Sequence, residues 1–230
     1  MVYRIIPLIT ISLLLILAAG CRQERSQAGQ IEALHMKYDI RYMDEMAGDI
    51  PTKMLPRTMD AYYTRNTVYT EIEGFLGQFR LVQVADLRRK QVTTLLNFFG
   101  NKVYYEGSSG ELPAAVHELP GLKYKDTGDT LRIGGLLSHR MEVSTDQDNY
   151  DIYYTRDFQI RRPNISTPYQ KVSHPLTDFR VGLSQLKMHL SCKSHSVEYI
   201  DYETFLIPDS YKQVDRAAME EIINSLFTKE

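Results

Sequence analysis

The chain has 230 residues, with 27 basic and 29 acidic side chains and a formal net charge of −2. A chain so close to neutral predicts neither a nucleic-acid-binding surface nor a polybasic membrane-binding surface. The 16 tyrosines and the frequent β-branched residues favour a sheet-rich fold, and 2 cysteines are too few for a disulfide framework.

The N-terminal region has the parts of a secretory signal. Arg4 supplies a positive charge, and Ile5–Leu17 is an apolar run too short to span a membrane. Small residues at 18–20 then precede Cys21. This ending resembles the lipobox of bacterial lipoproteins, although Ala18 stands where Leu is commoner. The alternative is an ordinary secretory signal followed by a chance cysteine.

The resemblance to a lipobox implies a lipid anchor. We expect residues 1–20 to be a signal peptide, Cys21 to carry the acyl chains and residues 21–30 to form a polar tether. Arg22 follows the cysteine, whereas Asp at that place favours retention in the inner membrane of lipoproteins. In a bacterium with two membranes, the expected location is therefore the outer membrane, facing the periplasm or the cell surface.

Residues 31–230 are expected to form a single domain, since about 200 residues can enclose a sizeable core. From Ile31 to Tyr105 short alternating segments and turn residues predict an up-and-down antiparallel meander. The expected strands are Ile31–Glu45, Met59–Thr64, Thr67–Glu73, Gln78–Asp86, Gln91–Phe98 and Lys102–Tyr105. Gln78–Asp86 has apolar residues on both faces, so one face is either covered or lines a cavity.

Two long irregular segments interrupt the strands. Residues 106–122 contain Pro113 and Pro120, with two helical turns expected at Ala114–Leu119. Residues 161–179 contain three further prolines. Irregular segments of this length within a domain are usually functional or mobile, so we expect them to cover the sheet.

The second half of the chain continues with strands and ends in a helix. Its central strand alternates Leu137, His139, Met141 and Val143 with polar residues, which predicts one apolar face. The other expected elements are strands at Leu122–Lys125, Thr130–Ile133 and Tyr150–Thr155, a hairpin of Leu183–Cys192 with His195–Glu203, and an amphipathic helix at Val214–Phe227 with Asp215 as its N-cap.

Several short stretches resemble an uncharacterised family of bacterial lipoproteins in the outer-membrane lipoprotein carrier (LolA/LolB-like) group. They are Thr127-Gly128, Ile133-Gly134-Gly135, Met141-Glu142-Val143, Asp151–Thr155 and Phe205–Tyr211. The resemblance implies a mainly β (α+β) fold: a curved, incompletely closed antiparallel β-barrel, with a covering loop or helix and an apolar cavity. Carrier relatives hold acyl chains in this cavity.

The sequence contains no convincing catalytic or metal motif. His117-Glu118 begins like HExxH, but Gly121 replaces the second histidine. Cys192 and His195 could form a reactive pair, although a buried inert cysteine is the commoner arrangement. Asp146, Asp148 and Asp151 could hold calcium, but no bidentate Glu follows at ligand spacing.

We therefore expect a lipid-anchored, non-catalytic envelope protein without cofactor or metal, which binds a lipid, an acyl chain or another hydrophobic small molecule. His139, Met141 and Val143 are the candidate ligand-binding residues, although they could equally be core residues. The alternative is an interaction module with a filled core that docks another envelope protein.

Overall fold

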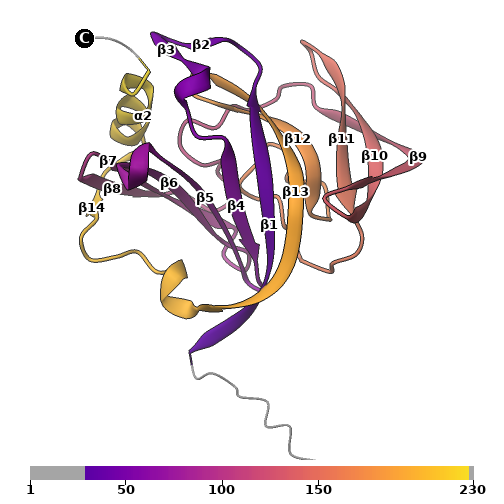
Figure 1. Cartoon of the computed structure of the whole chain (residues 1–230), viewed down its shortest axis with the longest axis horizontal. Helices are drawn as coiled ribbons and strands as arrows, with labels where there is room; N and C mark the ends of the chain where they lie inside the picture. Colours follow the sequence, from indigo (N-terminus) through magenta and orange to yellow (C-terminus); the bar gives the residue numbers. More distant parts are fainter. Residues whose placement is uncertain (1–28, 228–230) are drawn as a thin grey trace, which may run out of the picture. The chain divides into compact units, whose positions relative to one another are not determined.

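Most of the chain between residues 29 and 227 lies in one large curved sheet (Figure 1). This range is what the structure, a computed structural model, describes. The expected signal peptide, Cys21 and tether residues 21–28 lie outside the described residues. Ile31–Glu230 forms one compact unit.

The sheet has 12 strands in the order β14-β8-β7-β6-β5-β4-β1-β13-β12-β11-β10-β9. Their bounds are β1 Gln30–Tyr42, β4 Thr58–Tyr63, β5 Thr67–Gly74, β6 Phe79–Asp86, β7 Gln91–Phe98, β8 Asn101–Glu106, β9 Lys123–Ile133, β10 Leu136–Ser144, β11 Asn149–Thr155, β12 Leu176–Leu183, β13 Leu186–Asp201 and β14 Lys212–Gln213. Within the described residues, the edge strands β14 and β9 do not pair with each other, so the sheet is not closed into a barrel. The mainly β character is as predicted.

The two longest strands, β1 and β13, lie side by side at the centre of the sheet (Figure 1). Buried residues alternate along β1 at Leu34, Met36, Tyr38 and Ile40, which confirms the predicted long half-buried strand. The Tyr38 hydroxyl donates to the carbonyl oxygen of Leu176 at 2.6 Å and thereby ties β1 to the start of β12. One continuous core spans both halves of the sheet.

The predicted last hairpin is wrong in its position. The hairpin joins β12 to β13, and β13 continues through Cys192 and His195 without a turn. Lys193 and Ser194, where the sequence predicted the turn, are polar and exposed, so no apolar side chain marks them as part of a strand. They remain extended because they lie beside β1, where Lys193 Nζ pairs with Asp39 at 3.3 Å.

The predicted faces of the central strand, β10, are correct only in its second half. Leu137 is 40% exposed, whereas its neighbours Leu136 and Ser138 are buried. The Ser138 hydroxyl accepts a hydrogen bond from Thr177 on β12 at 2.9 Å, which satisfies a polar group that burial would otherwise penalise. The β9–β10 turn also packs closely on β13, since a Cβ on Gly134 would lie 2.7 Å from Cys192 Sγ.

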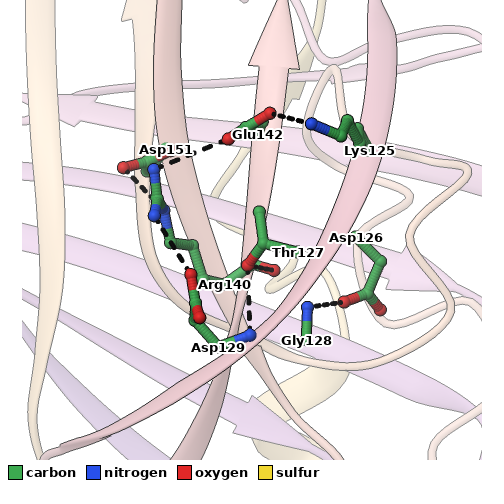
Figure 2. Close-up of polar contacts among 8 residues, drawn as sticks. All are labelled: Lys125, Asp126, Thr127, Gly128, Asp129, Arg140, Glu142 and Asp151. Atoms are coloured by element: carbon green, nitrogen blue, oxygen red, sulfur yellow. Dashed lines mark hydrogen bonds and ion pairs between the residues drawn. The ribbon is translucent and has the colours of Figure 1, made fainter.

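The two short strands expected at Leu122–Lys125 and Thr130–Ile133 form a single bulged strand, β9. The register with β10 shifts between His139 and Met141, and the turn-like residues 127–129 of β9 occupy this irregularity. Figure 2 shows the polar contacts beside it: Arg140 contacts Asp129 at 3.1 Å and Asp151 at 3.0 Å. These ion pairs lie on exposed strands, so they contribute little to stability.

The helical turns expected at Ala114–Leu119 are absent from the described structure. The segment instead pairs with the end of β12: His117 N donates to Gly182 O at 3.0 Å, and Ser184 N donates to Ala115 O at 2.8 Å. These tertiary hydrogen bonds replace those that a helix would make, and Pro113 and Pro120 limit any helix to a single short piece.

The C-terminal segment covers both sides of the β4–β8 half. After β13, residues 202–211 pack Phe205 against Tyr69, Val82 and Leu95 in a second, smaller core. Helix α2, Arg216–Ser225, then buries Met219 and Ile223 in the main core. The Asp215 side chain accepts from Ala218 N at 2.8 Å, as predicted for the N-cap. Among the described residues, no helix is long and apolar enough to cross a membrane.

Candidate functional site: an apolar pocket beneath two hairpin tips

An apolar cavity of about 200 Å³ opens at the end of the sheet where β1 finishes. None of its lining residues is charged. The strands of both halves and helix α2 contribute walls, among them Ile72, Phe79, Leu81, Met188 and Ile223. Such a space suits a hydrocarbon group, because it offers dispersion contacts without polar groups that need partners.

A second, smaller cavity of about 60 Å³ continues the first toward the irregular segments. The two cavities share the lining residues Ile72, Leu81, Leu183 and Met188. Val116 of the first irregular segment and residues 163–167 of the second line this inner part. Both irregular segments therefore lie against this cavity.

A hydrogen-bonded turn holds the second covering segment in place. Asn164 is buried, and its Nδ2 donates to Val172 O and His174 O, each at 2.8 Å. Because a buried amide without partners is costly, these bonds fix the segment against the cavity. In the first covering segment, Arg216 of α2 contacts both the Glu111 carboxylate and the Leu112 carbonyl oxygen.

Three exposed apolar residues lie on the hairpin tips at the pocket mouth; we call Phe75, Leu76 and Phe99 the rim. Phe75 and Phe99 line the pocket and are 40% and 64% exposed, and Leu76 is fully exposed. All three adopt a left-handed backbone conformation, with φ of 51°, 55° and 48°. This conformation costs a non-glycine residue about 1–2 kcal/mol, and retained strain of this kind often marks functional sites.

The sequence analysis did not identify the rim residues, although the sequence contains an unusual pattern at these turns. Phe75-Leu76-Gly77 and Phe99-Gly100 place large apolar residues directly before glycine at predicted turns, where polar residues are usual. The pocket itself had no local signal, because its walls come from strands far apart in the sequence. The sequence left open whether the apolar faces of Gln78–Asp86 are covered or line a cavity. One face, with Phe79 and Leu81, lines the cavity; on the other face, Val82 is covered by residues 202–211.

The candidate residues on β10 lie away from the pocket. Val143 is 1% exposed within the main core, and Met141 is half-buried against it. Neither residue, nor His139, lines either of the two cavities described above. A ligand-binding role for these three residues stays a prediction.

His139 belongs to a stack of rings beside the core. Its ring lies 5.4 Å from that of Tyr154, and the His174 ring lies 5.6 Å from Tyr154. Tyr154 Oη donates to Asp126 at 2.6 Å. Burial, followed by the nearby Arg156 and His139, lowers the pKa of His174. The surroundings of His174 therefore favour its uncharged form at neutral pH.

Cys192 and His195 do not form a catalytic pair in this structure. The two residues are three positions apart on one strand, so their side chains point to opposite faces. Burial raises the pKa of the Cys192 thiol to about 11, which keeps it protonated and unreactive. His195 Nδ1 instead donates to the Gly134 carbonyl oxygen at 3.0 Å.

Two of the three aspartates considered for calcium binding have basic partners. Asp148 pairs with Arg180 at 2.9 Å, and Asp151 pairs with Arg140 at 3.0 Å. Across residues 29–227 no group of three or more His, Cys, Asp or Glu side chains is arranged to hold a metal ion.

Comparison with known proteins gives a likeness in fold alone. No family model matches the chain, and no curated protein matches it. Two crystal forms of PNGF-II superpose with a TM-score of 0.52 at 13% sequence identity, over 84% of this chain and 33% of theirs. The chain thus spans about a third of the length of that protein, and the likeness carries no information on activity.

Proposed function

We propose that this chain is a lipid-anchored protein of the bacterial cell envelope that binds an acyl chain or another apolar part of a lipid in the pocket below the rim. The apolar pocket that opens between the two hairpin tips carries the proposal. No catalytic step is proposed, because binding alone accounts for a cavity without charged lining residues. The anchor rests on the lipobox-like sequence that ends at Cys21.

The architecture supports the resemblance to the lipoprotein carrier group. A curved sheet with an open edge, an apolar concave side and covering segments is the arrangement that such carriers imply. Here the covering elements are residues 107–122, residues 156–175 and helix α2, Arg216–Ser225. The expected outer-membrane location, facing the periplasm or the surface, belongs to the same proposal.

One observation favours the alternative of a protein-docking module. Leu76 is fully exposed and makes no packing contribution that would explain a large apolar side chain at a turn. A partner with an apolar patch would cover it together with Phe99. This alternative and ligand binding are compatible, since a partner covering the rim would also close the pocket.

Native mass spectrometry of residues 22–230, incubated with envelope lipid extract in a mild detergent, tests the proposal. We expect an adduct with the mass of a lipid or fatty acid, which organic extraction removes and which added fatty acid restores. A protein that carries no such adduct after incubation with fatty acids and envelope phospholipids would leave the docking module as the better account.

A further inference from the structure

A second hollow lies at the opposite end of the sheet, where β1 begins; we call it the anchor-end groove. It has a volume of about 770 Å³. Three arginines from separate segments line it: Arg65 in the β4–β5 turn, Arg88 in the β6–β7 turn and Arg161 in the second irregular segment. The apolar lining residues are Ile31, Leu34, Leu87, Phe158, Ile160 and Val197.

The three arginines are exposed, and none of them forms an ion pair with an acid of the described chain. The acid in the groove is Glu32, which accepts a hydrogen bond from the Tyr199 hydroxyl at 3.3 Å. A neighbouring hollow shares Arg161 and adds Arg162 and Lys171, without any acidic lining residue. The surface around the groove is therefore locally basic in a chain whose net charge is −2.

The groove lies where the chain leads to the proposed anchor. Ile31 lines it, and residues 22–30 separate this position from Cys21. The ten residue steps from Cys21 to Ile31 span at most about 36 Å, at 3.3–3.6 Å per residue. A lipid on Cys21 would therefore keep the groove within this distance of the bilayer surface.

We propose that the anchor-end groove docks on the phosphate headgroups of anionic phospholipids in the membrane that holds the acylated Cys21. Guanidinium groups bind phosphate oxygens by paired charge-assisted hydrogen bonds, and the apolar floor suits the upper part of the lipid chains. The exposed Val197 and Tyr199 beside the arginines fit the mixed polarity of a membrane interface. This inference rests on the proposed anchor and is independent of the apolar ligand.

Docking at this end would direct the pocket mouth away from the membrane. Ile31 lines the groove and Tyr42 lines the apolar pocket, so strand β1 separates the two sites. At about 3.3 Å per residue, the separation along the strand is on the order of 36 Å. The rim would then face away from the membrane, toward a molecule that delivers the ligand to the pocket or receives it.

Vesicle binding by residues 22–230 tests the groove without the acyl anchor. The sample contains the whole compact unit Ile31–Glu230 with its own core. We expect binding to vesicles that contain phosphatidylglycerol, little binding to phosphatidylcholine alone, and loss of binding as salt rises from about 0.05 to 0.5 M. The combined variant Arg65→Gln, Arg88→Gln, Arg161→Gln should bind about 100-fold more weakly.

A matched variant controls for net charge. Lys53→Gln, Lys123→Gln, Lys212→Gln removes three exposed basic charges elsewhere and should bind nearly as well as the wild type. Equal binding to neutral and anionic vesicles, or equal losses in the two triple variants, would overturn the proposal. Tight binding of inorganic phosphate that competes fully with vesicles would also overturn it, because the groove would then be a site for a soluble anion.

The same variants separate this inference from the proposed function. The arginine variant should take up fatty acid as the wild type does, because none of its three positions lines the apolar pocket. Acylation of Cys21 is measured separately by mass. Fatty-acid uptake therefore tests the proposed pocket, and the acyl mass tests the proposed anchor, both independently of the vesicle assay.

Discussion

The backbone N–H of Phe99 donates to the carbonyl oxygen of Gln78 at 2.7 Å. This bond ties the β7–β8 tip to the β5–β6 tip, so that the two tips carry the rim as one unit. Gly74 and Phe79 are paired across the first hairpin, and Phe98 and Asn101 across the second. The rim is therefore held by the sheet itself, and its strain is maintained by the pairing on either side.

The rim should be less stable than a polar turn would be. Asn adopts the left-handed conformation more readily than Leu or Phe, so Leu76→Asn and Phe99→Asn should each stabilise the fold by up to about 1 kcal/mol. Both should weaken the uptake of a fluorescent fatty acid. Lys90→Asn is the control, because Lys90 has φ 57° at a turn outside the rim and should gain stability without altered uptake. Rim variants with unchanged uptake would show that these residues do not serve the ligand.

Val143 distinguishes a packed core from a ligand site on β10. Since Val143 is almost fully buried and lines neither part of the apolar pocket, Val143→Phe should destabilise the fold by about 1–3 kcal/mol. Chemical denaturation measures this loss, and fatty-acid affinity of the folded variant should stay that of the wild type. Weakened binding with full stability would instead restore the prediction that His139, Met141 and Val143 face the ligand.

Glu111 should make the attachment of the first covering segment pH-dependent. The backbone N–H of Ser108, then Tyr105 and Arg216, lower the pKa of this carboxyl from its ordinary value of 4.5. Because the folded pKa lies below the unfolded one, the stabilisation is present above about pH 4.5 and is lost as the pH falls through the folded pKa. Glu111→Gln should therefore show a smaller decline in unfolding free energy on acidification than the wild type. An identical pH dependence would argue against this linkage.

The lipid anchor has a direct genetic test. Cys21→Ala removes the acyl acceptor, so the variant should lose its acyl mass and be left uncleaved or released. Membrane fractionation and intact-mass measurement report both properties. Equal partitioning of mutant and wild type, with no acyl mass on the wild type, would mean that Cys21 follows an ordinary secretory signal.

Sequence patterns predicted the elements that depend on local rules. The alternation from Leu34 to Ile40 gave β1, Arg65-Asn66 marked a hairpin turn, and Asp215 marked the start of the C-terminal helix. The errors arose where distant segments decide the outcome. His117 N bonds to Gly182 O instead of forming a helix, and the exposed residues after Cys192 remain a strand because β1 lies beside them.

For the candidate site, too, local features were predictable from the sequence and features that depend on distant segments were not. The apolar character of Phe79 and Leu81 was evident in the sequence, and the hairpin turns that became the rim were placed correctly. Which apolar face encloses a space depends on how β12, β13 and α2 fold over it, as Leu183, Met188 and Ile223 show. The residue pattern within one strand cannot show which of its apolar faces encloses a cavity.

Titration of residues 22–230 with a fluorescent fatty acid, comparing Ile72→Phe with Leu137→Phe, tests the ligand-binding account most directly. Ile72 lines both parts of the pocket, so the larger ring should fill space that the ligand needs. Leu137 is exposed and lines neither part of the pocket. The account predicts saturable binding by the wild type and by Leu137→Phe, and affinity at least about tenfold weaker for Ile72→Phe, with a melting temperature within a few degrees of the wild type. Wild-type protein without saturable binding, or a folded Ile72→Phe variant that binds as tightly as the wild type, would contradict it.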